Sequence, residues 1–297
     1  MPGRLLSRVA GQLLLVPIVA LGSYYVMAVL PPPVLEQGKT ADVVRAAEQR
    51  YRDDLGLSSP VGFLRPWQKL VRGERLGASD QGVTGATIFE KLAGSVVIGL
   101  GGLLLAILSA LLYAFVLVRT KGSRLWAGWQ LLQAVAFATP VFIPGMLVAS
   151  RIVSEDAWVG AVAAAGLLAV GPALFLGSLL EEGVERELAS MYVRCARAKG
   201  LSRSRATVRH ALPNVVPDLL DAIRPAATAL LAGSFAAEKV FGLHHFGELY
   251  VNAVIHKQTS VVVVSTTLFA AIVVLVALVT ETVRLLVDPR ARDASGA

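Results

Sequence analysis

Long apolar runs limit the folds that this chain of 297 residues can adopt. A helix needs about 20 consecutive apolar residues to cross the hydrocarbon core of a bilayer. Lipid offers the backbone no hydrogen bonds, so a chain inside it must satisfy its own as a helix or a closed barrel. Runs of this length lie at 9–30, 92–118, 125–150, 157–180, 214–237 and 261–287. They predict an all-α membrane protein with about six transmembrane helices.

The composition supports this class. Hydrophobic residues make up 55% of the chain and charged residues 16%, against about 25% charged residues in soluble domains. The net charge of +7 would suit nucleic acid, but the basic residues of the short loops concentrate on alternate loops between the runs, as they do beside membranes. We therefore expect membrane lipid as a partner and no nucleic acid.

Basic residues beside the runs also predict an orientation, because they mark the cytoplasmic side. They occur at Arg4 and Arg8 and within 119–124, 186–209 and 284–292. This pattern places both termini in the cytoplasm. The first run is longer than the 7–15 residues of a signal-peptide core and has no clear cleavage site, so an uncleaved helix is expected.

Three regions follow from these runs: an N-terminal transmembrane helix at 1–30, an extracytoplasmic segment at 31–91 and a membrane core at 92–290. The middle segment is mixed in charge, but loops of about 60 residues cross a membrane largely regardless of charge. Its Gly38-Lys39-Thr40 is similar to the end of a phosphate-binding loop. That motif needs a glycine where Pro33 stands, so no ATP-binding loop is predicted.

The longest basic stretch outside the runs is MYVRCARAKGLSRSRATVRHALPN at 191–214, which holds no acidic residue. Its helix-forming residues are interrupted at Gly200 and stopped at Pro213, which predicts two short helices that meet at a glycine. If one continuous helix joined it to the preceding Glu181, Glu182, Glu185 and Glu187, these glutamates would pair with its cations at i,i+4 spacing. A knob of this kind suits the docking of a soluble partner.

This stretch resembles the coupling loop of ABC-importer permeases. The family pattern is Glu-Ala-Ala, three residues, Gly, nine residues and Ile-x-Leu-Pro, and Gly200, Leu212 and Pro213 fall on it. The chain departs from the pattern where Arg194-Cys195 replaces Glu-Ala and His210 replaces Ile. The series Tyr-Val-Arg-x-Ala-Arg-Ala-Lys-Gly-Leu, beginning at Tyr192, is typical of the dipeptide, oligopeptide and nickel importer branch.

Three other segments are similar to the same family. Residues 51–77 resemble the external segment of this branch, and Asp-Pro-Arg at 288–290 resembles the family's ending. Residues 238–249 are similar to its Glu-x-Val-Phe and Pro-Gly-x-Gly-x-Leu turn, with His244 and His245 in place of Pro-Gly. Adjacent histidines could bind a metal or simply shape the turn. The scarcity of further ligands favours the turn, and no metal site is predicted.

The resemblance implies a type I ABC importer permease fold in a bacterial inner membrane. It implies a second permease subunit, two cytoplasmic ABC ATPase subunits that hydrolyse the ATP, and an extracytoplasmic substrate-binding protein. The chain itself would not be an enzyme and would carry no catalytic residue or cofactor. Its coupling loop at 181–213 would contact an ATPase through Arg194, Ala196, Arg197, Ala198, Lys199, Gly200 and Leu201. The branch implies peptides as the substrate, with nickel or another small solute as the alternative.

Charges at the start of the fifth run depart from the family. Asp218, Asp221 and Arg224 share one helix face through their three-residue spacing, and Asp221 could pair with Arg224. The same spacing predicts a pair between Glu281 and Arg284 in the last run. Charges at membrane depth usually face a partner or an aqueous cavity. The three residues therefore either line the inner mouth of a transport pathway or belong to a solvated helix end.

Two other classes of membrane protein fit less well. An ion-coupled secondary transporter often has inverted repeats and carboxylates near the middle of the bilayer, whereas the first four runs contain almost no acidic residues. An intramembrane enzyme needs a nucleophile with a base, or a metal motif such as His-Glu-x-x-His. The few histidines of this chain fall in the predicted loops.

Overall fold

The computed structural model describes residues 2–29, 41–56, 61–77, 82–120, 123–140, 142–151 and 157–287. Within these ranges the chain is helical, apart from its loops and one isolated bridge between Leu76 and Val83. Five helical stretches in them are long and apolar enough to cross a membrane: Val9–Val29, Gly85–Val116, Trp158–Leu188, Arg203–Phe241 and Thr259–Leu286. The predicted all-α membrane fold is confirmed.

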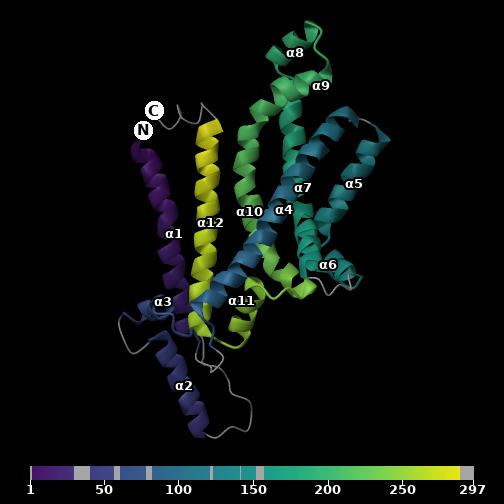
Figure 1. Cartoon of the computed structure of the whole chain (residues 1–297). Coiled ribbons are helices and arrows are strands. Elements are labelled where there is room, and N and C mark those ends of the chain that lie inside the picture. The colour runs from purple at the N-terminus through teal and green to yellow at the C-terminus, as the bar shows by residue number, and fades with distance from the viewer. Residues whose placement is uncertain are drawn as a thin grey trace. The chain divides into compact units, whose positions relative to one another are not determined.

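The helices follow one another along the chain (Figure 1). The long ones are α1 (Pro2–Val29), α4 (Gly85–Thr120), α7 (Ala157–Leu188), α10 (Leu212–Phe241) and α12 (Thr259–Val287). The shorter ones are α2 (Ala41–Leu55), η1 (Gly62–Leu64), α3 (Arg65–Val71), α5 (Arg124–Ala138), α6 (Phe142–Ala149), α8 (Met191–Ala198), α9 (Arg203–Ala206), the π-helical turn η2 (Thr207–Ala211) and α11 (Phe246–Ile255).

The third predicted span, 125–150, consists of two helices. α5 has 15 residues and α6 has 8, so neither reaches the length of about 20 residues that crosses a bilayer. Thr139 ends α5 in an extended conformation, with φ −91° and ψ 117°. The ring of the following Pro140 disfavours the helical region for Thr139. The proline therefore accounts for the break between α5 and α6.

The chain forms two compact units. Unit 1 comprises Met1–Ser95 and His244–Leu278, and unit 2 comprises Val96–Leu243 and Val279–Ala297. Both α4 and α12 contribute to each of them. Each unit is described by itself below.

Unit 1 is built around the first turns of α12. Residues 259–265 are all buried, so every face of this part of the helix is covered. Val263 packs with Tyr24 of α1 and Tyr51 of α2. The Tyr51 hydroxyl also donates a hydrogen bond to the carbonyl oxygen of Met27. The segment that follows the first membrane helix is thereby tied to both α1 and α12.

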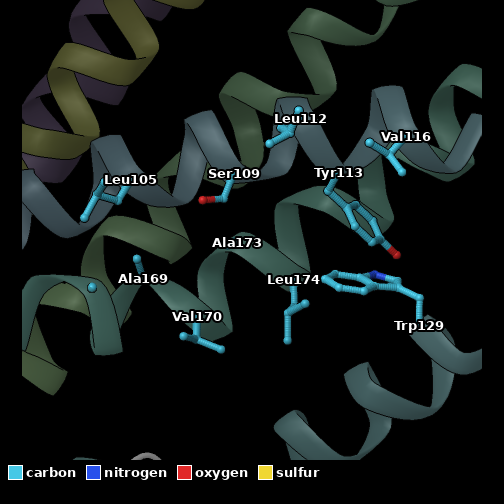
Figure 2. Close-up of a pocket in the computed structure, with 11 residues that line it drawn as sticks. Leu105, Ser109, Leu112, Tyr113, Val116, Trp129, Ala169, Val170, Ala173 and Leu174 are labelled. Atoms are coloured by element: carbon cyan, nitrogen blue, oxygen red, sulfur yellow. The ribbon is translucent and has the colours of Figure 1, made fainter. Parts of the chain in front are cut away.

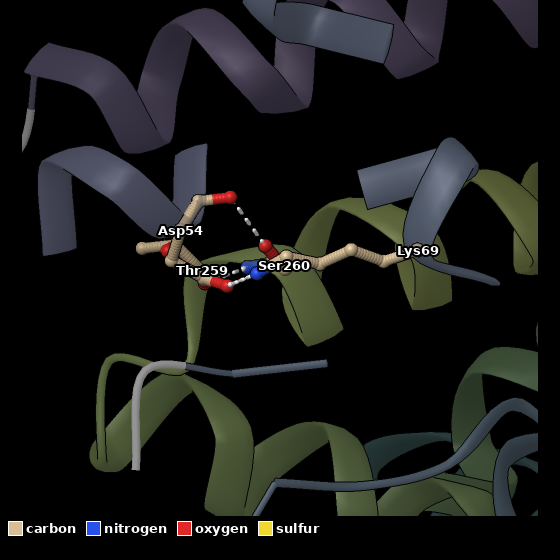
Figure 3. Close-up of polar contacts among 4 residues, drawn as sticks. All are labelled: Asp54, Lys69, Thr259 and Ser260. Carbon is tan, nitrogen blue, oxygen red and sulfur yellow. Dashed lines mark hydrogen bonds and ion pairs between the residues drawn. The ribbon is translucent and has the colours of Figure 1, made fainter. Parts of the chain in front are cut away.

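A buried carboxylate caps α12 in this unit. Asp54 is 3% exposed and accepts hydrogen bonds from the Thr259 hydroxyl at 3.2 Å and the Ser260 backbone N–H at 3.2 Å (Figure 3). Lys69 Nζ lies 2.7 Å from the same carboxylate. The first N–H groups of a helix have no partner within it and carry a partial positive charge. Asp54 satisfies one of them, the Ser260 N–H, from another helix, and Lys69 offsets its charge.

The core of unit 2 lies where α7 and α10 pack against each other. Leu176, Leu180 and Val184 of α7 are buried with Val215 of α10. A Cβ added to Gly183 would lie 2.5 Å from Val215 Cγ1, so the absence of a side chain allows this close approach. The same core extends into the basic loop, because Val193, Ala206 and Ala211 belong to it.

Candidate functional site

The basic loop folds into two short helices on either side of Gly200. α8 ends at Ala198, where Gly200 N–H donates to the Arg197 carbonyl at 2.9 Å. Gly200 has φ +93°, a backbone conformation that residues with a Cβ rarely adopt. The hydroxyl of Ser202 then accepts a hydrogen bond from Arg205 N–H at 3.4 Å and caps α9. The predicted pair of helices with a glycine between them is present.

An apolar side chain anchors α8 to unit 2. Val193 is fully buried in the α7–α10 core, and Leu201 packs against the same core. The predicted docking residues Arg194, Arg197, Ala198, Lys199 and Gly200 are exposed, whereas Ala196 and Leu201 are partly buried. α8 therefore turns one apolar residue inward and presents its cations outward. In Figure 1, α8 and α9 lie beyond the adjoining ends of α7 and α10.

Three polar side chains brace the base of α8. The Tyr192 hydroxyl donates to Glu187 Oε2 of α7 at 2.5 Å and accepts from Asn214 Nδ2 of α10 at 2.6 Å. Asn214 Nδ2 also donates to the His210 carbonyl at 3.2 Å. Burial and the hydrogen bond to Glu187 raise the pKa of Tyr192. These contacts link α8 to both α7 and α10.

The sequence did not predict this brace. Tyr192 and Asn214 stand out only as matches to the family's loop, and Glu187 was expected to pair with a loop cation. That expectation is wrong in its premise, because α7 ends at Leu188 and α8 begins separately at Met191. Another of these acids, Glu181, accepts hydrogen bonds from Trp126 Nε1 at 3.0 Å and the Tyr113 hydroxyl at 3.4 Å.

The exposed end of the loop is cationic. Its basic residues Arg194, Arg197, Lys199, Arg203, Arg205 and Arg209 are all exposed. Within the ranges that the structure describes, none of them forms an ion pair with an acidic side chain. A surface of one charge sign favours a partner of the opposite sign and speeds its encounter.

Charged residues at the start of α10 reach neighbouring helices. Asp218 pairs with Arg186 of α7 at 2.6 Å, Asp221 with Arg284 of α12 at 2.7 Å, and Arg224 with Glu281 of α12 at 3.1 Å. The prediction that Asp221 pairs with Arg224 is wrong for the described contacts, and Glu281 and Arg284 reach across to α10. The three-residue spacing did place the α10 charges on one side of the helix, but that side faces partners of opposite sign on other helices.

The turn between α10 and α11 holds the two adjacent histidines. His244 Nδ1 lies 2.6 Å from Glu248 Oε2, and Lys91 Nζ donates a hydrogen bond to the His244 carbonyl oxygen. His245 packs against Gly94, where a Cβ would lie 2.4 Å from its ring. Burial, followed by the charge of Lys91, lowers the pKa of His245. Both imidazoles thus take part in holding the turn.

Metal ligation would require more donors than these. The part of the chain that the structure describes holds no group of three or more His, Cys, Asp or Glu residues placed to share a metal ion.

An apolar cavity of about 720 Å³ lies among α4, α5 and α7. Figure 2 shows Leu105, Leu112 and Val170 along it, with Tyr113 and Trp129 close together at one end. Its lining contains no acidic or basic residue, so it offers apolar contacts and no acid–base chemistry. The apolar runs alone do not indicate this cavity, whose lining includes small residues of α7 such as Ala169 and Ala173.

Comparison with known proteins decides the family. Residues 102–293 match the family described as binding-protein-dependent transport system inner membrane component. The chain belongs to this family. The match contains α8, Gly200 and the charged face of α10, and with the apolar helices it identifies a multi-pass inner-membrane protein.

Curated relatives carry names of peptide transport systems. The chain is 34% identical over 125 residues to the dipeptide transport system permease protein DppB of Lactococcus lactis subsp. cremoris (strain MG1363), covering 42% of this chain and 41% of the relative. It is 24% identical over 202 residues to DppB of Bacillus subtilis (strain 168), covering 65% of this chain and 66% of the relative. The matched part is thus less than two thirds of each relative's length.

A solved structure shares the fold of this family member. A chain of the MetNI methionine ABC transporter in an inward-facing conformation matches with a TM-score of 0.55 and 20% identity, covering 75% of this chain and 97% of the solved chain. At this identity the likeness concerns the fold alone. It confirms the expected type I ABC importer permease fold.

Proposed function

We propose that this chain is one permease subunit of an ATP-driven importer of peptides and forms half of the translocation pathway. The observation that carries the proposal is the exposed cationic α8, braced on α7 and α10, within a chain of the binding-protein-dependent transport family. The names of the dipeptide transport relatives support peptides as the substrate class. A second permease subunit would supply the other half.

Two cytoplasmic ATPase subunits would drive transport, one of them docked on α8. The exposed Arg194, Arg197 and Lys199 would meet acidic groups of the ATPase, and Ala198 would allow close approach because its side chain is small. The sequence has no phosphate-binding loop of its own, which is consistent with ATP hydrolysis in a partner. This arrangement requires both termini and α8 to face the cytoplasm.

Movement of the ATPase would reach the membrane helices through the base of α8. Val193 and the Tyr192 hydroxyl connect α8 to α7 and α10, so a displaced α8 takes the ends of both helices with it. Alternating access in transporters proceeds by rocking of packed helices as rigid bodies. Asp218, Asp221 and Arg224, one to four turns into α10, would then border the inner mouth of the pathway.

An extracytoplasmic binding protein would deliver the peptide. The segment 31–91 is the proposed contact, because its described part is fixed to α12 through Asp54 and presents the exposed Arg45, Arg50 and Arg52 of α2. A contact made there would act on the start of a membrane helix.

The lone cysteine provides a direct test of docking. Cys195 is exposed on α8, so a thiol-reactive photo-crosslinker attached to the natural chain should give an adduct with the ATPase in the assembled complex. Cys195→Ser is the matched control.

Proteoliposomes holding the complex should take up labelled dipeptides only with ATP and binding protein, and nickel uptake should be absent. A crosslinker that reacts only from the opposite side of the membrane would refute the proposal.

A further inference from the structure

The charged residues of α10 form a connected set with its neighbours. We propose that Arg186, Asp218, Asp221, Arg224, Glu281 and Arg284 are positioning residues that hold the inner ends of α7, α10 and α12 together, so that these ends move as one body with α8. We name this set the charge clamp. The inference rests on the proposed function, because α8 is taken as the docking helix.

Two residues of the clamp lie on the helices that flank the basic loop. Arg186 is in the last turn of α7, which precedes α8, and Asp218 is in the second turn of α10, which follows η2. Their ion pair at 2.6 Å joins α7 and α10, the two long helices that the loop connects. Two further pairs, at 2.7 Å and 3.1 Å, continue from α10 to α12. Through these pairs the clamp connects α12, by way of α10, to the helices that flank the loop.

The order of the charges fits one alignment of α10 and α12. Asp221 lies opposite Arg284, and Arg224 lies opposite Glu281, as expected for helices that run in opposite directions. A slide of one helix by three residues would place Arg224 opposite Arg284, or Asp221 opposite Glu281. Both alternatives bring like charges together, which is unfavourable. The clamp therefore selects one register as well as joining the helices.

Burial of the pairs argues for register rather than for stability. The side chains of Asp221 and Arg284 are 48% and 34% exposed, and ion pairs this exposed add little to the stability of a fold. Glu281 is 13% exposed, so it would be left largely out of water if Arg224 were removed or reversed. A charged side chain in that position resists sliding of α12 more than it stabilises the resting structure.

The clamp also gives the α10 charges a role other than substrate binding. Within the described residues each of them has an oppositely charged partner on another helix. A residue that binds a peptide during transport must keep the sign of its charge. A pair that joins two helices requires only that the two charges are opposite, whichever helix carries the positive one. Exchange of the two signs separates these roles.

Charge exchange in the full complex tests the inference. Asp221→Arg and Arg284→Asp are made singly and together, and spin labels on Cys195 and on Leu286→Cys report the spacing between α8 and the inner end of α12. Each single reversal should broaden the distance distribution, and the double exchange should restore it. Peptide uptake per ATP hydrolysed should fall at least fivefold in the singles and recover to at least half in the double. Lys239→Asp, a charge reversal at the other end of α10, is the control and should leave the distribution unchanged.

Other results would overturn the clamp. Unchanged distributions in both single variants would show that the pairs do not position α12. A double exchange that stays as broad as the singles would show that each side chain acts alone. If the reversals prevent assembly, the single neutralisations Asp221→Asn and Arg284→Gln remove the same ion pair without bringing like charges together, and each should broaden the distance distribution. The distances between the spin labels can be measured without transport. A wild-type complex that failed to import peptides would therefore count against the proposed function, and the clamp would still be judged by the label distances.

Discussion

Replacement of Gly200 probes the connection between α8 and α9. Its φ of +93° is left-handed, and an L-residue there costs about 1–2 kcal/mol. A Cβ at Gly200 would meet no atom within 4 Å, so strain of the backbone is the whole cost of Gly200→Ala. A cost of this size lowers the population of the native loop by roughly 5- to 30-fold relative to competing loop conformations. Val193 should still hold α8 on the core, so insertion and assembly persist.

Proline should act more strongly at this position. Its ring fixes φ near −65° and removes the N–H that donates to the Arg197 carbonyl at 2.9 Å. We expect Gly200→Asn, which tolerates left-handed backbone best, to retain the most peptide uptake per ATP hydrolysed, followed by Gly200→Ala and then Gly200→Pro. A bulky residue at Ala198 should reduce coupling by steric exclusion. Proteoliposome uptake, measured beside ATP hydrolysis and Cys195 crosslinking, checks the order. Normal coupled uptake by Gly200→Pro would refute the reasoning.

Three further perturbations have defined outcomes. Tyr192→Phe removes a hydroxyl that bridges α7 and α10, at about 1 kcal/mol, so hydrogen exchange of the α8 amides should accelerate about fivefold; unchanged exchange would contradict the brace. Asp54→Ala should lower the unfolding free energy by about 3 kcal/mol, because it removes one partner of a buried ion pair, whereas Asp54→Asn should cost less; thermal unfolding in detergent measures both. The pKa of His245 is lowered in the folded chain, so the unfolded chain binds more protons below pH 6.5 and stability should fall on acidification below that value. His245→Gln should flatten this part of the pH profile.

The sequence was sufficient for features that depend on local pattern. Five of the six predicted runs correspond to helices long enough to cross a membrane, because each span requires about 20 apolar residues. Gly200 indicated the break between α8 and α9 because the break depends on the backbone conformation of that one residue, which has φ +93°. The break at Pro140 is local in the same sense, since a proline acts on the residue directly before it.

Contacts between distant residues could not be predicted in the same way. The spacing of Asp221 and Arg224 allowed a pair along one helix, but the choice of Arg284 as the partner of Asp221 depends on where α12 lies. Asp54 likewise showed no sign of its contact with Ser260, which is 206 residues away. The brace at Tyr192 required knowledge that α7 stops before α8 begins. Each of these depends on helix packing, which periodicity does not specify.

The cap on α12 sets an order of events during synthesis. Asp54 leaves the ribosome long before Ser260. While the intervening membrane helices are inserted, Lys69 is the one described partner that its carboxylate can already have. Contacts this far apart in sequence close late in folding. A nascent chain that stops before α12 would leave Asp54, Tyr24 and Tyr51 without their contacts to that helix and accessible to proteases, and completion of the last helix would end that exposure.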